Sequence, residues 1–456
     1  MVNTLFLPEL REMLATGNAQ EMAEFCTALH PARTADFMAG LNDSELWQVL
    51  SHAEVATQVD VFSYLESHRQ IAILETQDRE QLAKMVAQLS PDDRVDLLQE
   101  VDETVLDDIL QRMPVEERRD FLRLSQYPEG TAGAVMTTDF AKVSETLTVR
   151  QAMEEISRQS ENYETIYYVY VVDDEDHLRG LVSARQLLTS MRNPDCLLSE
   201  IMETDLIAVR VSDDQEDVAN HVARMDLLAI PVVGPERRIL GIITHDDVID
   251  VMREEATEDA HRSAAVDPLD ETYLQTSVFT LTWKRGIWLA VLFFFALMTA
   301  FALQRFEEPF ETWAWLVPFI PLVISSGGNS GSQSATLIIT ALSRGHITLQ
   351  DYRRVMIREL KMGLLLGGGL ALMGFAVCFL FVPNDQALGP YATLVVPLTL
   401  LLVVMCGTLT GSVLPLVFEK LGWDPAMMSN PFVAGIVDIL GILIYVTVAV
   451  RLLNPV

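Results

Sequence analysis

Five long apolar runs in the C-terminal part of the chain limit what it can fold into more than any other feature. The runs are Gly286–Gln304, Thr312–Ser343, Met362–Asn384, Gln386–Phe418 and Pro425–Val450. A helix needs about 20 predominantly apolar residues to cross the hydrocarbon core of a bilayer. Because buried helices of a soluble core poorly explain five such runs in succession, we predict five membrane-spanning helices.

Charge divides the chain into two parts. The formal net charge is −32, yet the residues from Ser277 onward contain 10 Lys and Arg against 9 Asp and Glu, which leaves −33 for residues 1–276. This acidity argues against a nucleic-acid partner, because phosphates are bound by Lys and Arg. The four cysteines contain no CxxC pair, so neither a disulfide scaffold nor a zinc site is indicated. The N-terminus lacks a basic segment followed by an apolar core, so we expect no signal peptide and a cytosolic acidic part.

Basic residues in the short loops predict the orientation of the spans. Lys284 and Arg285 precede the first run. Five more basic residues lie between the second and third runs, namely Arg344, Arg353, Arg354, Arg358 and Lys361. We therefore predict a multi-pass protein of the cytoplasmic (inner) membrane, with its N-terminal domains in the cytosol and its C-terminus outside.

One charged residue lies inside the runs. Asp438 is near the middle of the last run, where a carboxylate costs roughly 2.5–3.5 kcal/mol even on the lenient insertion scale. No Lys or Arg lies within any run to neutralise it. A protonated carboxyl bonded inside the helix bundle is one explanation, and a cation pathway is the one we favour.

A polar stretch, SSGGNSGSQS at Ser325–Ser334, interrupts the second run. Its Asn329 and Gln333 are four residues apart and would share one helix face. Polar groups at membrane depth are tolerated where they line a cavity, and small-residue helix packing is the alternative, to which we assign Gly367–Gly369 of the third run. Mg²⁺ keeps several waters and is usually held by one or two carboxylates. Asp438 beside amides therefore fits a hydrated Mg²⁺, and a symmetric dimer would bring two copies of Asp438 to one axis.

Residues 133–252 contain an internal repeat. Ala134–Asp139 (AVMTTD) resembles Glu200–Asp205 (EIMETD), and the strand pattern of Tyr170–Leu181 returns at Pro231–Ile242. Each copy predicts a helix, two short strands around a turn, and a second helix that starts at Ser183 or Thr244. The first copy is about five residues longer, near residues 161–167.

Residues 1–128 contain a second, looser repeat. Leu29–Leu50 resembles Leu89–Leu110, with prolines at 31 and 91. Proline at a helix start, followed by apolar residues at spacings of three and four, predicts stacked helical hairpins.

Acidic residues crowd the connection between the internal repeat and the first span. They are Asp246, Asp247, Asp250, Glu254, Glu255, Glu258 and Asp259. On a helix, several of them share one stripe and repel one another. A solvated helix face explains this pattern, and so does a cluster that a divalent cation neutralises. Its position before the first span suits a sensor that acts on a gate.

The internal repeat resembles a tandem pair of cystathionine-β-synthase (CBS) domains. Such pairs are regulatory modules, and many bind adenosine nucleotides between the repeats. The resemblance makes ATP a candidate ligand, with Tyr168 and Arg185 as candidate contacts. In some nucleotide-binding members an Asp after the last strand holds the ribose. Gln186 stands there in the first copy, which argues against that contact.

The chain as a whole resembles the MgtE family of magnesium channels and transporters. The most specific segments are GGNSGSQSAT at Gly327–Thr336 and DPAMMSNP at Asp424–Pro431, followed by Asp438. The implied domains are a helical N domain (1–128), CBS domains at about 129–194 and 195–252, a connecting plug helix (253–276) and a five-helix transmembrane domain (277–456). The expected fold class is therefore multi-domain, with an α, an α/β and a membrane all-α part.

The resemblance also implies how these parts work. Family members are homodimers with a pore on the two-fold axis, and a plug helix, here about residues 246–268, closes the pore when Mg²⁺ is abundant. The candidate pore residues are Asp438, Ala434, Asn329, Gln333, Thr336 and Asn430. The candidate sensor residues are Asp93, Asp96, Asp246, Asp247, Asp250, Glu255, Glu258 and Asp259.

We accordingly expect a Mg²⁺-selective channel for passive uptake, closed by Mg²⁺ binding to the acidic N and CBS domains. No GxxxxGK, HExxH or nucleophile motif is present, so we expect neither a pump nor an enzyme. Two alternatives stay open. One is a CBS-regulated membrane receptor without transport, and the other is a proton-coupled divalent-cation carrier that uses Asp438.

Overall fold

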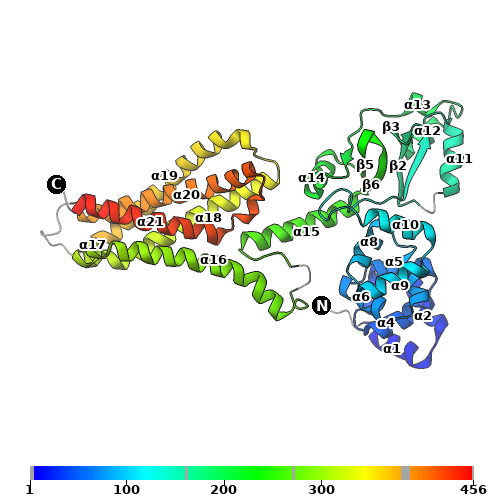
Figure 1. The fold of residues 1–456 in the computed structure, drawn as a ribbon, viewed down its shortest axis with the longest axis horizontal. Coiled ribbons are helices and arrows are strands. Elements are labelled where there is room, and N and C mark those ends of the chain that lie inside the picture. The colour runs from blue at the N-terminus through cyan, green and yellow to red at the C-terminus, as the bar shows by residue number, and fades with distance from the viewer. Residues whose placement is uncertain (1–4, 160–162, 270–272, 382–390, 454–456) are drawn as a thin grey trace. The chain divides into compact units, whose positions relative to one another are not determined.

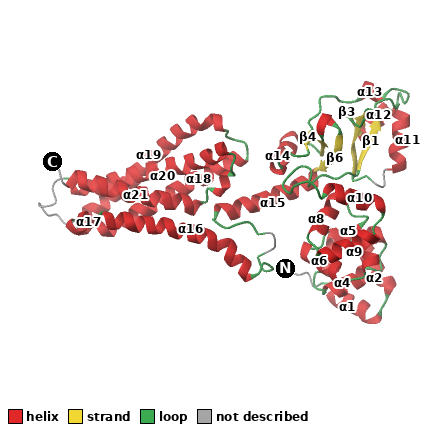
Figure 2. Ribbon diagram, in the orientation of Figure 1, coloured by secondary structure: helices red, strands yellow, loops and turns green. Residues whose placement is uncertain are grey.

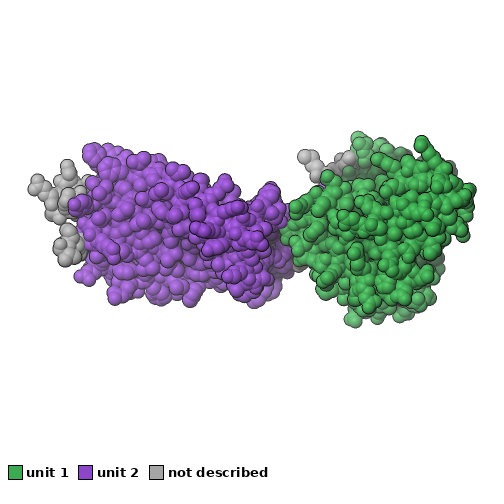
Figure 3. All heavy atoms as spheres, turned by 90° about the horizontal axis from the view of Figure 1, so that it is seen from above, with its two compact units in different colours: residues 1–252 green, residues 253–456 purple. Residues whose placement is uncertain are grey.

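The computed structural model describes residues 5–159, 163–269, 273–381 and 391–453. They form two compact units, residues 1–252 and 253–456, which Figure 3 shows in green and purple. Figure 2 shows that the first unit combines helices with strands, whereas the described residues of the second unit are helical.

Ten short helices occupy the described residues up to Leu124 (Figure 1). They are α1 (Leu7–Thr16), α2 (Ala19–Ala28), α3 (Pro31–Met38), α4 (Asp43–Leu50), α5 (Val55–Ser63), α6 (Ser67–Thr76), α7 (Arg79–Val86), α8 (Pro91–Gln99), α9 (Glu103–Arg112) and α10 (Val115–Leu124). From α2 to α8, each helix packs against the helix two further along the chain, as in a helical solenoid. The pairs α3–α4 and α8–α9 correspond to the two copies of the looser repeat, and α3 and α8 both begin with their proline.

A buried guanidinium joins consecutive helices of this solenoid. Arg94 of α8 is only 3% exposed. It donates to the carbonyl oxygens of Val86 at 3.1 Å, Ala87 at 3.1 Å and Leu89 at 2.7 Å. These carbonyls lie at the end of α7 and in the turn that follows it, where helical hydrogen bonding stops, so Arg94 satisfies them and ties this turn to α8.

Two three-stranded sheets follow, one for each copy of the internal repeat. The first copy contains β1 (Phe140–Ser144), α11 (Val149–Gln159), β2 (Thr165–Val172), β3 (Leu178–Ser183) and α12 (Ala184–Ser190). Helix α13 (Leu198–Ile201) links it to the second copy. The second copy contains β4 (Val209–Arg210), α14 (Gln215–Met225), β5 (Ala229–Val233) and β6 (Ile239–Thr244). In each sheet the first strand pairs in parallel with the second, which pairs antiparallel with the third.

The predicted order of helix, strand, turn, strand and helix is confirmed in both copies. β2 has 8 residues and β5 has 5, which agrees with a longer first copy, although residues 160–162 lie outside the described residues. The two copies also exchange contacts, since Thr137 bridges to Ile242 and Glu203 bridges to Leu181. A Cβ on Gly180 would lie 2.8 Å from the Glu203 carbonyl oxygen, and one on Gly241 would lie 2.6 Å from that of Thr137. Each repeated glycine therefore makes room for the segment that leads into the other copy.

Helix α15 (His245–Ser263) begins at the predicted place, directly after β6. It ends earlier than the predicted plug helix, which we expected to reach about residue 268. The backbone turns left-handed at Ala265, where φ is 59°, and the amides of Ala264 and Ala265 bond to the carbonyls of His261 and Arg262. A left-handed residue of this kind ends a helix, so the expected plug segment 253–276 contains only the last part of α15.

The second unit contains six further α-helices in its described residues. They are α16 (Val278–Arg305), α17 (Glu307–Thr312), α18 (Ile320–Ser343), α19 (Tyr352–Phe381), α20 (Val395–Leu421) and α21 (Asn430–Leu453). Among the described residues, four helices have the length and apolarity to cross a membrane, namely α16, α19, α20 and α21. The predicted count of five spans is thus supported for four helices and stays a prediction for α18, whose polar stretch lowers its hydropathy.

The second predicted run does not form one helix from Thr312. A 3₁₀ segment occupies Ala314–Phe319, and α18 begins only at Ile320, with Pro321 in its first turn. Proline is accepted at a helix start and breaks a helix interior, which explains the displaced start. The junction between the third and fourth runs lies outside the described residues.

Glycines set the closest helix packing in the second unit. Helix α18 packs against α20 and α21, and α19 packs against α20 (Figure 1). A Cβ on Gly407 would lie 2.4 Å from the Gly327 carbonyl oxygen, and one on Gly411 would lie 2.0 Å from that of Gly331. Small-residue packing, the alternative considered for the polar stretch, therefore describes the face of α18 that meets α20. The assignment of Gly367–Gly369 to packing holds for Gly367, which meets Leu401. Among the described residues, Gly368 and Gly369 have no neighbour from another helix within 4 Å of an added Cβ.

Candidate ion pathway and acidic cluster

The polar stretch of α18 lies against the N-terminal half of α21. A Cβ on Gly328 would lie 3.4 Å from Asp438 Oδ1 and 3.3 Å from Ala434 Cβ. Because glycine has no side chain, the backbone of α18 comes directly beside the carboxylate. The fold thus brings Asp438 and Ala434 to the stretch that the sequence marks as polar.

A second contact lies one to two turns toward the C-terminus of α18 and toward the N-terminus of α21. Ser332 Oγ donates to the carbonyl oxygen of Asn430 at 3.0 Å, and Thr336 Oγ1 donates to Asn430 Oδ1 at 3.0 Å. Asn430, Ala434 and Asp438 follow one another at spacings of four, so they share one face of α21. This face and α18 form the candidate pathway.

The remaining candidate pore residues lie on the exposed side of α18. Asn329, Gln333 and Thr336 are all exposed in the single chain, at the spacings of four and three that form one helical stripe. Asn329 Nδ2 donates to Ser325 Oγ at 3.2 Å, within the same helix. A stripe of amides and hydroxyls thus faces outward from a helix of the membrane unit.

A second candidate site is an acidic cluster in the first unit, where α8 approaches the start of α15. Asp92 and Asp93 of α8 interact electrostatically with three acids of α15, which are Asp246, Asp247 and Asp250. Burial, with Asp247 as the largest neighbouring charge, raises the pKa of Asp92 well above its usual range. Burial also raises the pKa of Asp247. The fold therefore holds like charges together at a cost in free energy.

Two members of this cluster, Asp92 and Glu164, are absent from the sequence-based sensor set. Asp92 is 8% exposed, and its Oδ1 has no hydrogen-bond partner among the described residues. Desolvation and the nearby Asp247 and Asp93 raise the pKa of Glu164, just before β2, to about 7. Asp92 could have been predicted from the sequence, because it is adjacent to the candidate Asp93 at the start of α8. Glu164 could not, because only the tertiary fold brings it to the acidic cluster.

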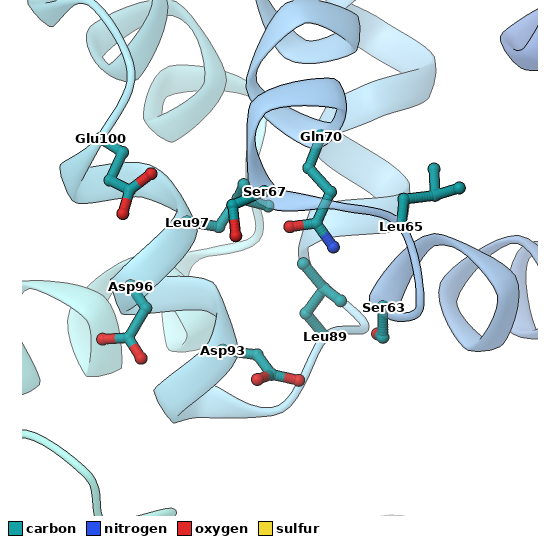
Figure 4. Close-up of a pocket in the computed structure, with 9 residues that line it drawn as sticks. All are labelled: Ser63, Leu65, Ser67, Gln70, Leu89, Asp93, Asp96, Leu97 and Glu100. Atoms are coloured by element: carbon teal, nitrogen blue, oxygen red, sulfur yellow. The ribbon is translucent and has the colours of Figure 1, made fainter. Parts of the chain in front are cut away.

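A cavity of about 230 Å³ lies beside this cluster, within the solenoid. Figure 4 shows Asp93, Asp96 and Glu100 on one side and Ser67 and Gln70 facing them. Asp96 thus lines the same cavity as Asp93, and the sensor role of both residues stays a prediction. Carboxylate, hydroxyl and amide oxygens are the donors that suit Mg²⁺.

The other predicted sensor residues, Glu255, Glu258 and Asp259, lie in the part of α15 that belongs to the second unit. Arg262 forms ion pairs with Glu258 and with Asp424, which precedes α21. Burial and the charge of Asp424 raise the pKa of Asp259. The predicted sensor set therefore divides into two acidic groups, one in each unit.

Neither group forms a finished metal shell. In the part of the chain that the structure describes, no three His, Cys, Asp or Glu side chains converge closely enough to hold an ion. The carboxylates are close enough to repel one another. Such spacing suits a cation that keeps its waters.

The candidate nucleotide residues flank the start of α12. Tyr168 of β2 pairs with Ser183 of β3, and Arg185 lies in the first turn of α12. Gln186 Oε1 accepts from the amide and the hydroxyl of Ser183, at 2.8 and 2.9 Å. Gln186 is therefore committed to capping α12. In the second copy, Asp247 accepts from the amide and hydroxyl of Thr244 in the same way.

Comparison with known families gives a consistent result. A model described as a divalent cation transporter, MgtE, matches residues 320–448. The MgtE intracellular N domain matches residues 29–130, and the CBS domain matches residues 132–193 and 198–254.

Individual relatives extend this match to the whole chain. The chain is 36% identical over 451 residues to the magnesium transporter MgtE of Thermus thermophilus, covering 98% of each protein. The crystal structure of the soluble part of a magnesium transporter aligns at 35% identity with a TM-score of 0.52, over 55% of this chain and 97% of that one. The cytosolic domain of the Mg²⁺ channel MgtE in complex with ATP aligns at 33% identity with a TM-score of 0.51, over 53% and 98%.

The alignment with the Thermus thermophilus protein and the three family models together include the helical solenoid, the paired sheets and the helical membrane unit. They include the helices that carry Asp438 and the polar stretch. The chain belongs to the MgtE family of magnesium transporters, which are not enzymes.

Proposed function

We propose that this chain is a Mg²⁺-selective channel that mediates passive uptake across the cytoplasmic (inner) membrane. The observation that carries the proposal is the contact between Gly328 and Asp438, next to the hydroxyl bonds to Asn430. This contact puts the backbone of α18 beside the carboxylate, and the hydroxyl bonds to Asn430 lie about two turns away on the same face of α21. Such a set of groups recognises the water shell of Mg²⁺ without stripping it. The membrane potential would drive entry, at about 4.6 kcal/mol per 100 mV for a divalent ion.

The working form that we propose is a homodimer. Asn329, Gln333 and Thr336 are exposed in the single chain, and a polar stripe that faces lipid is costly. A second copy across a two-fold axis would cover the stripe and bring a second Asp438 to the same ion. This arrangement requires α18 to span the membrane as the fifth helix. The N-terminal domains then lie in the cytosol and the C-terminus outside.

We further propose that cytosolic Mg²⁺ closes the channel by neutralising the acidic groups. Asp92, Asp247 and Glu164 repel one another in the first unit, so this arrangement costs less when a divalent cation screens it. The predicted boundaries at 128, 252 and 276 would then separate the sensor, the CBS pair, the connecting helix and the pore domain, and the boundary at 194 would divide the two CBS domains. A tenfold shift of the gate needs only about 1.4 kcal/mol of differential binding.

ATP is the second ligand that we propose, for the CBS pair. The support is a solved cytosolic domain of a Mg²⁺ channel in complex with ATP, at 33% identity. Tyr168 and Arg185 would contact the nucleotide beside the start of α12. Gln186 and Asp247 both cap the helix that follows their last strand, so a ribose contact from either residue would have to replace a cap bond.

The test is Mg²⁺ flux into liposomes that contain the purified protein. We expect wild-type flux without a pH gradient, reduced by millimolar Mg²⁺ on the cytosolic face. Asp438→Asn should abolish flux. Thr447→Ala is the matched control, because Thr447 is exposed on the opposite side of α21 and bonds only to its own helix, at Leu443 O. Absence of wild-type flux would favour a receptor, and flux that requires a pH gradient would favour a proton-coupled carrier.

A further inference from the structure

A buried carboxylate in the membrane unit has no role in the pathway described so far. Glu359 lies in the second turn of α19 and is 8% exposed. Its Oε2 accepts a hydrogen bond from Ser334 Oγ of α18 at 2.7 Å, and Ser334 is 5% exposed. A buried carboxyl is costly unless it is bonded, so this contact joins α18 firmly to α19.

Ser334 lies on the side of α18 that faces away from α21. At 3.6 residues per turn, a separation of two residues is about 200° around a helix. Ser334 is two residues from both Ser332 and Thr336, which bond to Asn430 of α21. Helix α18 is therefore held by hydrogen bonds on two nearly opposite sides.

The position of Glu359 is itself fixed by α20. Thr408 Oγ1 lies 3.4 Å from the Glu359 carbonyl oxygen and 3.0 Å from that of Met405. One turn further along α19, a Cβ on Gly363 would lie 2.5 Å from Thr408 Oγ1. Because α19 and α20 are this close, the backbone that carries Glu359 stays in place if α18 rotates.

We propose that Glu359 is a positioning residue that fixes the rotation of α18 through Ser334 and thereby sets ion selectivity. The inference rests on the proposed pathway along α18 and α21. A rotation of α18 would change how Ser332 and Thr336 meet Asn430, and it would move the backbone of Gly328 relative to Asp438. Mg²⁺ demands near-ideal octahedral geometry, whereas Ca²⁺ accepts flexible coordination. Loss of the bond therefore relaxes selectivity toward Ca²⁺.

The experiment compares Mg²⁺ and Ca²⁺ flux in liposomes for Ser334→Ala, Glu359→Leu, Glu359→Gln and the double variant Ser334→Ala/Glu359→Leu. We expect the Mg²⁺-to-Ca²⁺ flux ratio to fall about five- to tenfold in the first two variants. Glu359→Gln should retain most of the selectivity, because its amide oxygen can accept from the same hydroxyl. The double variant should be no worse than the more severe single variant, since both remove one bond. Thr447→Ala is the control.

Each outcome has a defined meaning. A selectivity that is unchanged in Ser334→Ala overturns the inference, even if Glu359→Leu proves unstable, because the serine-to-alanine change removes the bond with the smallest change in side-chain volume. A uniform loss of flux with an unchanged ratio also overturns it. Wild-type protein that passes no Mg²⁺ refutes the proposed pathway instead, so the two failures are distinguishable.

Discussion

Substituting Gly411 by alanine tests whether the contact between α18 and α20 supports the ion pathway. The added Cβ would lie 2.0 Å from the Gly331 carbonyl oxygen, whereas ordinary contact begins at 3.4 Å. The obstacle is backbone, not the flexible end of a side chain, so the helices must separate by on the order of 1 Å.

The expected cost follows from this distance. Forcing an extra methyl group into a packed interior costs typically about 1–3 kcal/mol. At about 2–4 °C per kcal/mol for a region of this size, the melting temperature should fall by several degrees. Gly331 is one turn from Gly328, which lies beside Asp438. We therefore expect Mg²⁺ flux to fall several-fold as well.

The assay pairs thermal unfolding in detergent with Mg²⁺ flux in liposomes. Gly369→Ala is the matched control, because no atom of the described residues beyond its own stretch of helix lies within 4 Å of its added Cβ. That variant should be neutral or stabilised by up to about 1 kcal/mol, since alanine is the better helix former. If Gly411→Ala behaves like Gly369→Ala in both measurements, the close packing of α18 on α20 is refuted.

Three further predictions concern the first unit. Without divalent cations, raising the pH from 5 to 8 should lower its unfolding temperature, and Mg²⁺ should reverse the loss. Burial raises the pKa of Asp139 to about 6 and that of Glu164 to about 7. Proton binding by these groups therefore stabilises the folded state at low pH, and this stabilisation is lost as the pH rises through 6 to 7. An unfolding temperature that rises with pH would contradict this prediction. Asp92→Asn should raise the Mg²⁺-free unfolding temperature and weaken Mg²⁺-dependent closure, measured as flux against cytosolic Mg²⁺, and unchanged closure would remove Asp92 from the sensor. Arg94→Met should destabilise the solenoid by about 1–3 kcal/mol, since it removes the donor of the Ala87 and Leu89 carbonyls. Denaturant unfolding with an unchanged midpoint would show that water replaces the guanidinium.

The features that sequence predicted well depend on local periodicity. The paired sheets and the repeated helix pairs follow from apolar spacing within a few dozen residues, and Asp438 stands out because its neighbours carry no charge. The helix ends were less predictable. Proline moved the start of α18 to Ile320, and a left-handed residue, Ala265, ended α15 early.

The residues that sequence missed depend on contacts between distant segments. Glu164 joins the acidic cluster only because the fold brings the start of β2 near α8 and α15. Glu359 lies in a basic loop by sequence, among Arg358 and Lys361, and becomes a buried group only because α19 begins at Tyr352 and packs on α20. Charge in the sequence therefore does not reveal which carboxylates the fold buries.

Helix α18 reconciles the two explanations of its polar stretch. Gly327 and Gly331 meet α20. Gly328, Ser332 and Thr336 meet α21, and Ser334 meets α19. Small residues thus serve helix packing on one side and hydrogen bonding on the others. Since α18 has few large apolar side chains in this stretch, close backbone contact and directional bonds fix its position more than hydrophobic burial does. Such bonds depend steeply on distance and angle. Substitutions along α18 should therefore impair selectivity and flux before they unfold the membrane unit.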